Sequence, residues 1–246
     1  GAGPYPQTYY NLKDESLSEK AEQKKKSFFN RYQKLISSIE AKVNIPFAGK
    51  YILGGKLSDL NEFRGVSDAV EVLQFDPNAI ILTDGGGSID TCTLKPSHSR
   101  TIPYSEIEMH QRINEIEHKK MDYEKLFNLS QISQLPIKRL LMKSYKNAIL
   151  KTEVQEDYYF IFNLDIGYCL MNANKNNQMI NFIGKDKKEN FPNPHSLIQV
   201  DLRYLFGLMT NIYHWNNAQV GSHLQVRRFP DNHNRTAQNF LNFLTV

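Results

Sequence analysis

A long amphipathic segment that leads directly into a short apolar run constrains the fold of this chain most. Apolar side chains recur at helical spacing through residues 14–42 and charged residues fill the other face, which predicts a helix. Asp14 and Ser16 are suitable N-cap residues. Residues 43–47 then predict a buried strand that ends in a tight Ala-Gly loop. A helix followed by a strand is typical of layered α/β architecture.

The first residues have the composition of a loop. Residues 1–6 are Gly-Ala-Gly-Pro-Tyr-Pro, and Gly and Pro supply the backbone angles with which a chain leaves a strand. The chain is therefore expected to start in the middle of a fold. Part of the chemistry of that fold is then expected to lie outside this chain.

The middle of the chain predicts short strands at 69–74 and 79–83, and a turn at 84–87 with a returning strand at 88–94. The three glycines of that turn also suit a phosphate-binding loop, but such a loop needs a helix directly after it, and residues 89–93 favour a strand. Helical patterns follow at 104–119 and 136–150, with a domain boundary between them.

The last part of the chain predicts a different architecture. Short antiparallel strands are expected at residues 158–162, 167–171 and 179–183. A further strand is expected at 197–200, and residues 220–226 alternate. Asp201 is placed to cap a helix that extends to Met209. A final amphipathic helix passes through Phe240, Leu241 and Leu244. His214-Trp215-Asn216-Asn217 predicts a packed corner, with a ligand site as the alternative.

Composition narrows the class of protein. An apolar content of 40% fits a folded soluble chain, and no apolar run approaches a membrane span. The net charge of +4 is spread along the chain, and the triplet Lys24–Lys26 is expected on a solvated helix face, so nucleic acid and membrane are not implied as partners. Cys92 and Cys169 are interpreted as reduced core thiols of a cytoplasmic protein.

Catalytic patterns are scarce. The seven histidines form no HxH, HExxH or HxxxH pattern, and GxSxG is absent, although a dispersed catalytic triad leaves no fixed spacing to test. The loop after residue 51 is the candidate for binding an anionic or polar substrate, with a solvated connection as the alternative. Its predicted substrate-binding residues are Tyr51, Lys56, Asn61 and Arg64, and Asp68 follows them.

Two ends of the chain resemble one family. Residues 1–6, the Lys-rich helix and residues 45–51 (Ile-Pro-Phe-Ala-Gly-Lys-Tyr) resemble the second half of metallo-β-lactamase-fold proteins, in the branch of CMP-N-acetylneuraminate hydroxylase. Residues 215–223 and 227–231 resemble the tail of that branch. The resemblance implies a parent enzyme that binds zinc or iron through an HxHxDH motif. This chain has no such motif, so no metal ligand and no cofactor are assigned to it.

The last hundred or so residues also resemble the sterol-carrier-protein-like fold, through the order of their strands, the helix that begins at Asp201 and the final apolar helix. Domains of that kind hold apolar ligands in a cleft between the sheet and the C-terminal helix. The resemblance therefore implies an apolar or acylated ligand as an alternative to a sugar-nucleotide-like one.

The sequence thus predicts an α+β protein of two domains. Residues 1–128 are expected to form a partial α/β layer, half of a metallo-β-lactamase-type sandwich, and residues 129–246 a sterol-carrier-like domain with a mostly antiparallel sheet. The expected function is that of the C-terminal portion of a metal-dependent hydrolase, inactive alone. The alternative is a non-enzymatic binding module. The expected partner is a second copy of the chain or a missing N-terminal half that covers the exposed apolar surface.

Overall fold

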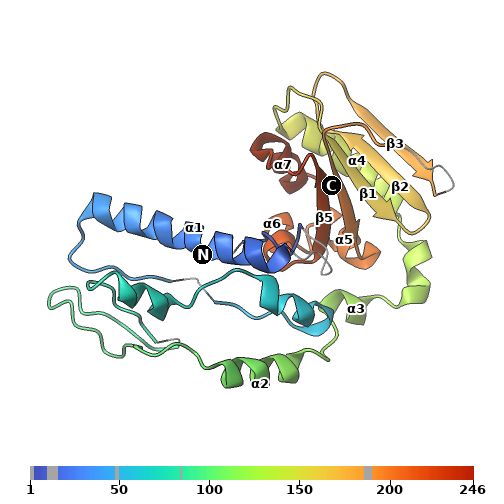
Figure 1. Cartoon of the computed structure of the whole chain (residues 1–246). Coiled ribbons are helices and arrows are strands. Elements are labelled where there is room, and N and C mark those ends of the chain that lie inside the picture. Colours follow the sequence, from blue (N-terminus) through green and yellow to red (C-terminus); the bar gives the residue numbers. More distant parts are fainter. Residues whose placement is uncertain (1–2, 10–15, 48–49, 84, 186–189) are drawn as a thin grey trace. The chain divides into compact units, whose positions relative to one another are not determined.

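The computed structural model describes residues 3–9, 16–47, 50–83, 85–185 and 190–246. The chain divides into two compact units, of which the first comprises Gly1–Gln7 and Leu12–Lys119 and the second Thr8–Asn11 and Lys120–Val246. Figure 1 traces the elements of each unit. The fold is mixed α and β, as the sequence predicts, and the sheet belongs to the second unit. Of the expected N-caps, Asp14 lies outside the described residues.

One long helix organises the first unit. Helix α1 spans Leu17–Ile39, and the shorter elements after it are the 3-10 segments η1 (Gly55–Phe63) and η2 (Ala69–Gln74) and helix α2 (Glu106–Ile116). A small core forms where Val70, Val72, Ala79 and Ile81 pack against partly buried aromatic side chains, Phe29 and Tyr32 of α1 among them. Burial of this apolar surface stabilises the unit.

The strands predicted in the first unit are wrong, because among the described residues these segments form only single bridges and not continuous strands. Asn44 pairs with Ala79 in a single parallel bridge, and Leu82 pairs with Ser99 in a single antiparallel one. Residues 88–94 contribute one further bridge, at Ile89. These segments have the apolar pattern of strands, but a strand also needs a hydrogen-bonding partner along its length. Among the described residues each of these segments finds one only at isolated positions.

Residues 69–74 are not a strand but η2. Asp68 accepts a hydrogen bond from the backbone N–H of Val70 (3.1 Å), and Glu71 accepts one from the N–H of Asp68 (2.7 Å). This reciprocal capping box starts a helical turn. The valines that suggested a strand are still buried, because Val70 and Val72 lie on the inner side of that turn.

The second unit holds a five-stranded sheet in the order β3-β2-β1-β4-β5. Its strands are β1 (Tyr159–Leu164), β2 (Gly167–Asn172), β3 (Met179–Gly184), β4 (His195–Val200) and β5 (Leu224–Phe229). Strands β1 and β4 run parallel, and the other neighbours are antiparallel. The predicted mostly antiparallel sheet is confirmed. Residues 220–223 lie outside it, because Val220 ends a helix.

Helices pack on one face of this sheet (Figure 1). Phe160 of β1 stacks on Phe240 with ring centroids 5.6 Å apart, and Phe162 meets Trp215 edge-on at 6.2 Å. Asp201 caps its helix as predicted, by accepting from the N–H of Arg203. The helical elements of the unit are α3 (Asp122–Leu126), η3 (Leu129–Gln134), α4 (Ile137–Lys151), α5 (Leu202–Met209), α6 (Trp215–Val220) and α7 (Arg235–Asn242).

The two cysteines differ from each other. Cys169 is fully buried in β2, as predicted, and burial raises the pKa of its thiol to about 12. Cys92 is exposed, so its prediction as a core thiol is wrong. It lies in a turn that Asp90 closes by accepting hydrogen bonds from the N–H groups of Cys92 and Thr93. A turn of that kind offers no buried side to its middle residue.

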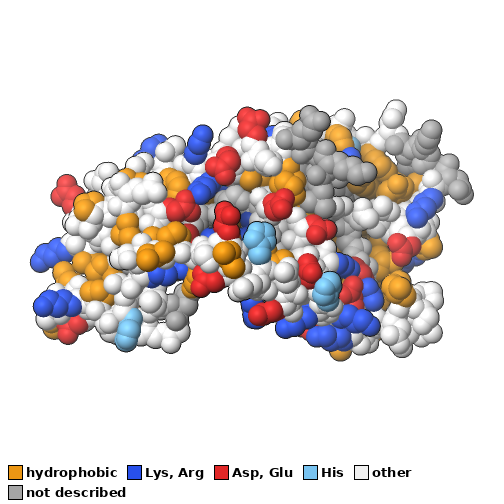
Figure 2. Space-filling model, turned by 60° about the horizontal axis from the view of Figure 1, so that its bottom comes forward, with side chains coloured by type: hydrophobic (Ala, Val, Ile, Leu, Met, Phe, Trp, Pro, Cys, Tyr) orange, Lys and Arg blue, Asp and Glu red, His pale blue; other side chains and the backbone are white. Residues whose placement is uncertain are grey.

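The surface mixes charged and apolar side chains. Hydrophobic side chains reach the surface between acidic and basic ones on the face drawn in Figure 2. Within the described ranges, no helix combines the length and the apolar character that crossing a bilayer requires.

Candidate functional site

The predicted binding loop contributes to a buried cationic cluster in the first unit. Arg64 follows η1 and is 6% exposed, and Lys24 from the N-terminal half of α1 is 9% exposed. The ammonium of Lys24 donates to the carbonyl oxygens of Gly3 (3.0 Å) and Arg64. The guanidinium of Arg64 lies over the ring of Tyr51, 5.2 Å from its centroid. We refer to Lys24, Arg64, Tyr51 and the adjoining Gln7 as the Lys24–Arg64 cluster.

Asn61 shapes the loop that presents Arg64. Its side-chain oxygen accepts from the N–H of Leu53 (2.9 Å), and its NH₂ group donates to the carbonyls of Leu53 and Ser58 (2.8 Å each). Its own carbonyl accepts from Nε of Arg64 at 2.9 Å. One buried amide thus closes the turn and fixes the guanidinium. Asn61 acts here by positioning Arg64.

Of the four residues predicted to bind substrate, three come together. Tyr51, Asn61 and Arg64 are linked as described, whereas Lys56 at the start of η1 is exposed. Sequence reasoning missed Lys24, whose expected position on a solvated face is wrong. Leu17, Ala21 and Lys24 are the buried residues of α1 and lie three and four residues apart, on one side of the helix. That spacing was the available signal, and the neighbouring charges of the triplet obscured it.

Burial perturbs the ionisation of this cluster. The pKa of Lys24 falls to about 8, first because burial disfavours its charged form and then because of the nearby Arg64 charge. Burial also lowers the pKa of Arg64 and raises that of Tyr51. Within the described part of the chain, no Asp or Glu forms an ion pair with Lys24 or Arg64.

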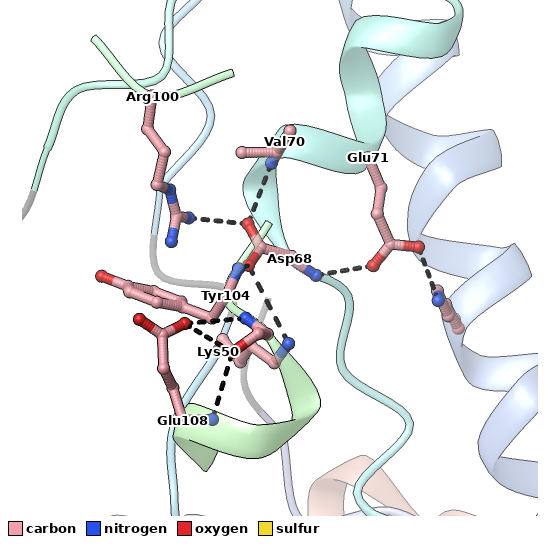
Figure 3. Close-up of polar contacts among 9 residues, drawn as sticks. Lys50, Asp68, Val70, Glu71, Arg100, Tyr104 and Glu108 are labelled. Carbon is pink, nitrogen blue, oxygen red and sulfur yellow. Dashed lines mark hydrogen bonds and ion pairs between the residues drawn. The ribbon is translucent and has the colours of Figure 1, made fainter. Parts of the chain in front are cut away.

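A second buried charge in the same unit, that of Asp68, is compensated by opposite charges and hydrogen-bond donors. Figure 3 centres on Asp68, whose carboxylate is almost fully buried. It accepts from Nη2 of Arg100 (2.6 Å) and from the N–H of Tyr104 (3.1 Å), in addition to its contact with Val70. Lys50 lies at 3.9 Å. Asp68 therefore has two cations and two backbone donors, and it ties residues 50, 70, 100 and 104 together.

The second unit contains an apolar pocket of about 820 Å³. It lies where η3, the first turn of α4 and the turn between β1 and β2 meet. Leucine, isoleucine and proline side chains dominate its lining, and Lys138, Arg139 and Asp165 bring charge to it. Its size and apolar character are those of small-molecule sites in proteins.

The space between the sheet and the final helix is closely packed along α7. Phe240 is fully buried against Phe160, and Nε1 of Trp215 donates to the carbonyl of Leu244 (3.0 Å). The apolar pocket described above therefore lies in a different part of the unit from the sterol-carrier-like cleft that the sequence led us to expect.

Metal binding is not supported by the residues at hand. Among the described ranges, no group of three or more His, Cys, Asp or Glu side chains is placed to hold one ion. The residues here therefore do not fit the zinc or iron that the family resemblance implies for a parent enzyme. No family model, curated protein or solved structure matches the chain.

Proposed function

We propose that this chain is the substrate-side portion of a metallo-β-lactamase-fold, metal-dependent hydrolase, and that it is inactive without a segment that carries the metal ligands. The observation that carries this proposal is an uncovered apolar groove in the first unit. The groove is about 300 Å³ and lies between α1 and residues 45–47. Phe47 is 83% exposed and Leu35 is 54% exposed beside it.

The strand edge beside the groove supports this proposal. Asn44 pairs on one side with Ala79 in a single bridge, and among the described residues no strand lies on the other side of residues 43–47. The C-terminal half of α1 leaves Leu35 uncovered in the groove beside residues 45–47. A further strand paired with residues 43–47 is expected to cover Leu35. An unpaired strand edge and exposed apolar side chains beside it are features of surfaces that a partner covers.

The test begins with the gene product in its source organism. Intact-mass measurement and N-terminal sequencing are expected to reveal additional residues that contain an HxHxDH motif. The longer product is expected to bind zinc or iron stoichiometrically and to hydrolyse an ester or phosphoester from a substrate panel. Stoichiometric metal on the 246-residue chain alone would contradict the proposal, as would a native product that lacks the motif.

A pair of variants tests the groove itself. Leu35→Lys in the longer product is expected to lower its melting temperature and hydrolytic rate, because it places a charge in a buried interface. In the 246-residue chain, where the groove is open, the same variant is expected to change stability little. Ile107→Lys is the matched control, since Ile107 of α2 is exposed and lies outside the groove. Equal effects of Leu35→Lys in both products would contradict the assignment.

The apolar pocket favours a second candidate function, the binding of an amphiphilic ligand with an apolar body and an anionic head. Its apolar lining suits the body, and Lys138 and Arg139 suit the head. The dye anilinonaphthalene sulfonate has this chemistry. We expect saturable fluorescence enhancement that Ser133→Trp, which fills the pocket, lowers at least tenfold in affinity. Ser37→Trp is the control, because Ser37 is an exposed residue of α1 outside the pocket. An equal loss of dye affinity in that variant would exclude this site.

A further inference from the structure

Two cations of the first unit are buried with no compensating anion among the described residues. Lys24 and Arg64 are each more than nine-tenths buried, and the ammonium of Lys24 is bonded to the backbone oxygen of Arg64 itself. Burying one uncompensated charge costs several kcal/mol, and two adjacent like charges add their repulsion. Asp68 shows that the same unit surrounds a buried charge with opposite charges elsewhere. The Lys24–Arg64 cluster departs from that pattern.

Several N–H and O–H donors of the cluster make no hydrogen bond among the described residues. Lys24 uses two of its three N–H groups on carbonyl oxygens, and Arg64 uses Nε on the carbonyl of Asn61. Nη1 of Arg64 is buried and has no partner among the described residues. The hydroxyl of Tyr51 accepts from Nε2 of Gln7 (3.0 Å), so its own hydrogen remains for donation. Three segments of the cluster thus carry donors that are not used among the described residues.

We propose that the Lys24–Arg64 cluster is a binding site for a small oxyanion of the phosphate class, either inorganic phosphate or the phosphoryl group of a monoester. Two positive charges match a phosphate dianion, and a guanidinium fork with an ammonium is a common phosphate-binding pair. Tyr51 is only partly buried, so the cluster reaches solvent at this residue. The inference does not depend on the hydrolase assignment, because it concerns residues of this chain alone.

The experiment is a titration of the 246-residue chain with inorganic phosphate, followed by thermal unfolding and by calorimetry. Sodium chloride keeps the ionic strength constant. A saturable rise of the melting temperature is expected, as for any ligand that binds only the folded state. Methyl phosphate tests the monoester as the source of the anion: tighter binding than inorganic phosphate assigns the site to a phosphorylated metabolite. Weaker binding assigns it to free phosphate.

Variants assign the site. Arg64→Gln is expected to weaken phosphate affinity at least tenfold, and Arg112→Gln, on the exposed surface of α2, is expected to leave it unchanged. Lys24→Met keeps the apolar stem of Lys24 and removes its charge, which provides a second test if Arg64→Gln does not fold. A melting temperature that rises no more with phosphate than with chloride would overturn the proposal. So would undiminished affinity in whichever of the two variants folds.

Calorimetry adds a readout that a purely structural role would not produce. At pH 8, Lys24 is about half protonated in the free protein. A bound anion favours its charged form, so phosphate binding is expected to take up roughly half a proton, seen as a dependence of the binding heat on the buffer. Lys24→Met is expected to abolish this uptake. Binding without proton uptake in the unmodified chain would place the phosphate elsewhere and overturn the assignment.

Discussion

Replacing Gly65 with alanine is expected to destabilise the first unit more than any exposed substitution in it. Gly65 has a φ of +57°, and a Cβ built on it would lie 2.4 Å from the carbonyl oxygen and 2.9 Å from the Cα of Ala21. Both contacts are backbone atoms of α1, which no side-chain rotation can relieve. Left-handed strain of about 1 kcal/mol and an overpacking cost of about 1–3 kcal/mol sum to roughly 3 kcal/mol of lost unfolding free energy.

Urea denaturation of Gly65→Ala measures this cost, and Gly85→Ala is its matched control. Gly85 also has a positive φ, of +77°, but nothing lies within 4 Å of the position that a Cβ would take there. The control therefore isolates backbone strain, and we expect a loss of about 1 kcal/mol there. Equal losses in the two variants would mean that α1 does not pack on Gly65, and that the carbonyl of Arg64 is not held against Lys24 in this way.

The second unit could be predicted well from its sequence because its signals are local. The apolar and aromatic runs at residues 158–162 and 167–171 mark two strands that pair with each other across a short turn. Asp201 caps its helix through the N–H two residues later. Each of these features depends on neighbours in the chain, so a pattern of a few residues is enough to specify it.

The first unit could be predicted less well because its structure depends on contacts between distant residues. Strand patterns at 43–47 and 79–83 meet only at Asn44 and Ala79 among the described positions, and a pattern does not reveal how much of an edge finds a partner. The capping box of Asp68 and Glu71 was a readable helix signal that the apolar pattern of residues 69–74 outweighed.

In the candidate site, too, the residues that are close in sequence could be predicted and the distant ones could not. Tyr51 and Arg64 were predicted because they stand in one polar loop of the sequence. Gln7 lies 44 residues before Tyr51, and Lys24 contacts the carbonyl of a residue 40 positions later. Only the fold brings these side chains to the loop, so sequence spacing could not include them.

The stability of the unmodified chain is expected to rise with pH between about 8 and 10.5, through Lys24. Its pKa is lowered in the folded state from an ordinary value of 10.5 to about 8. Below pH 8 the side chain is charged in both states and contributes no slope. Between these values the unfolded state binds more protons than the folded state, so the free energy of unfolding increases with pH.

The size of this effect follows from the same pKa. Each pKa unit corresponds to about 1.4 kcal/mol, so the fall to about 8 sets an upper bound of about 3 kcal/mol on the gain. Tyrosines whose pKa is raised by burial, Tyr51 among them, act in the opposite direction near and above pH 10. The difference between the unmodified chain and Lys24→Met removes that shared contribution, because both proteins keep these tyrosines.

The measurement is urea denaturation at pH 7, 8, 9 and 10. Lys24→Met is expected to lose the rise of the unfolding free energy with pH. Lys26→Met is the control and is expected to keep that rise, because Lys26 is at the exposed end of the same triplet. A rise that persists in Lys24→Met would assign the titration to another group. Added phosphate sharpens the test, because an anion beside Lys24 favours its charged form and returns its pKa toward the ordinary value. Saturating phosphate is therefore expected to flatten the pH dependence of the unmodified chain. If no phosphate binds beside Lys24, the pH dependence of stability will be unchanged by phosphate.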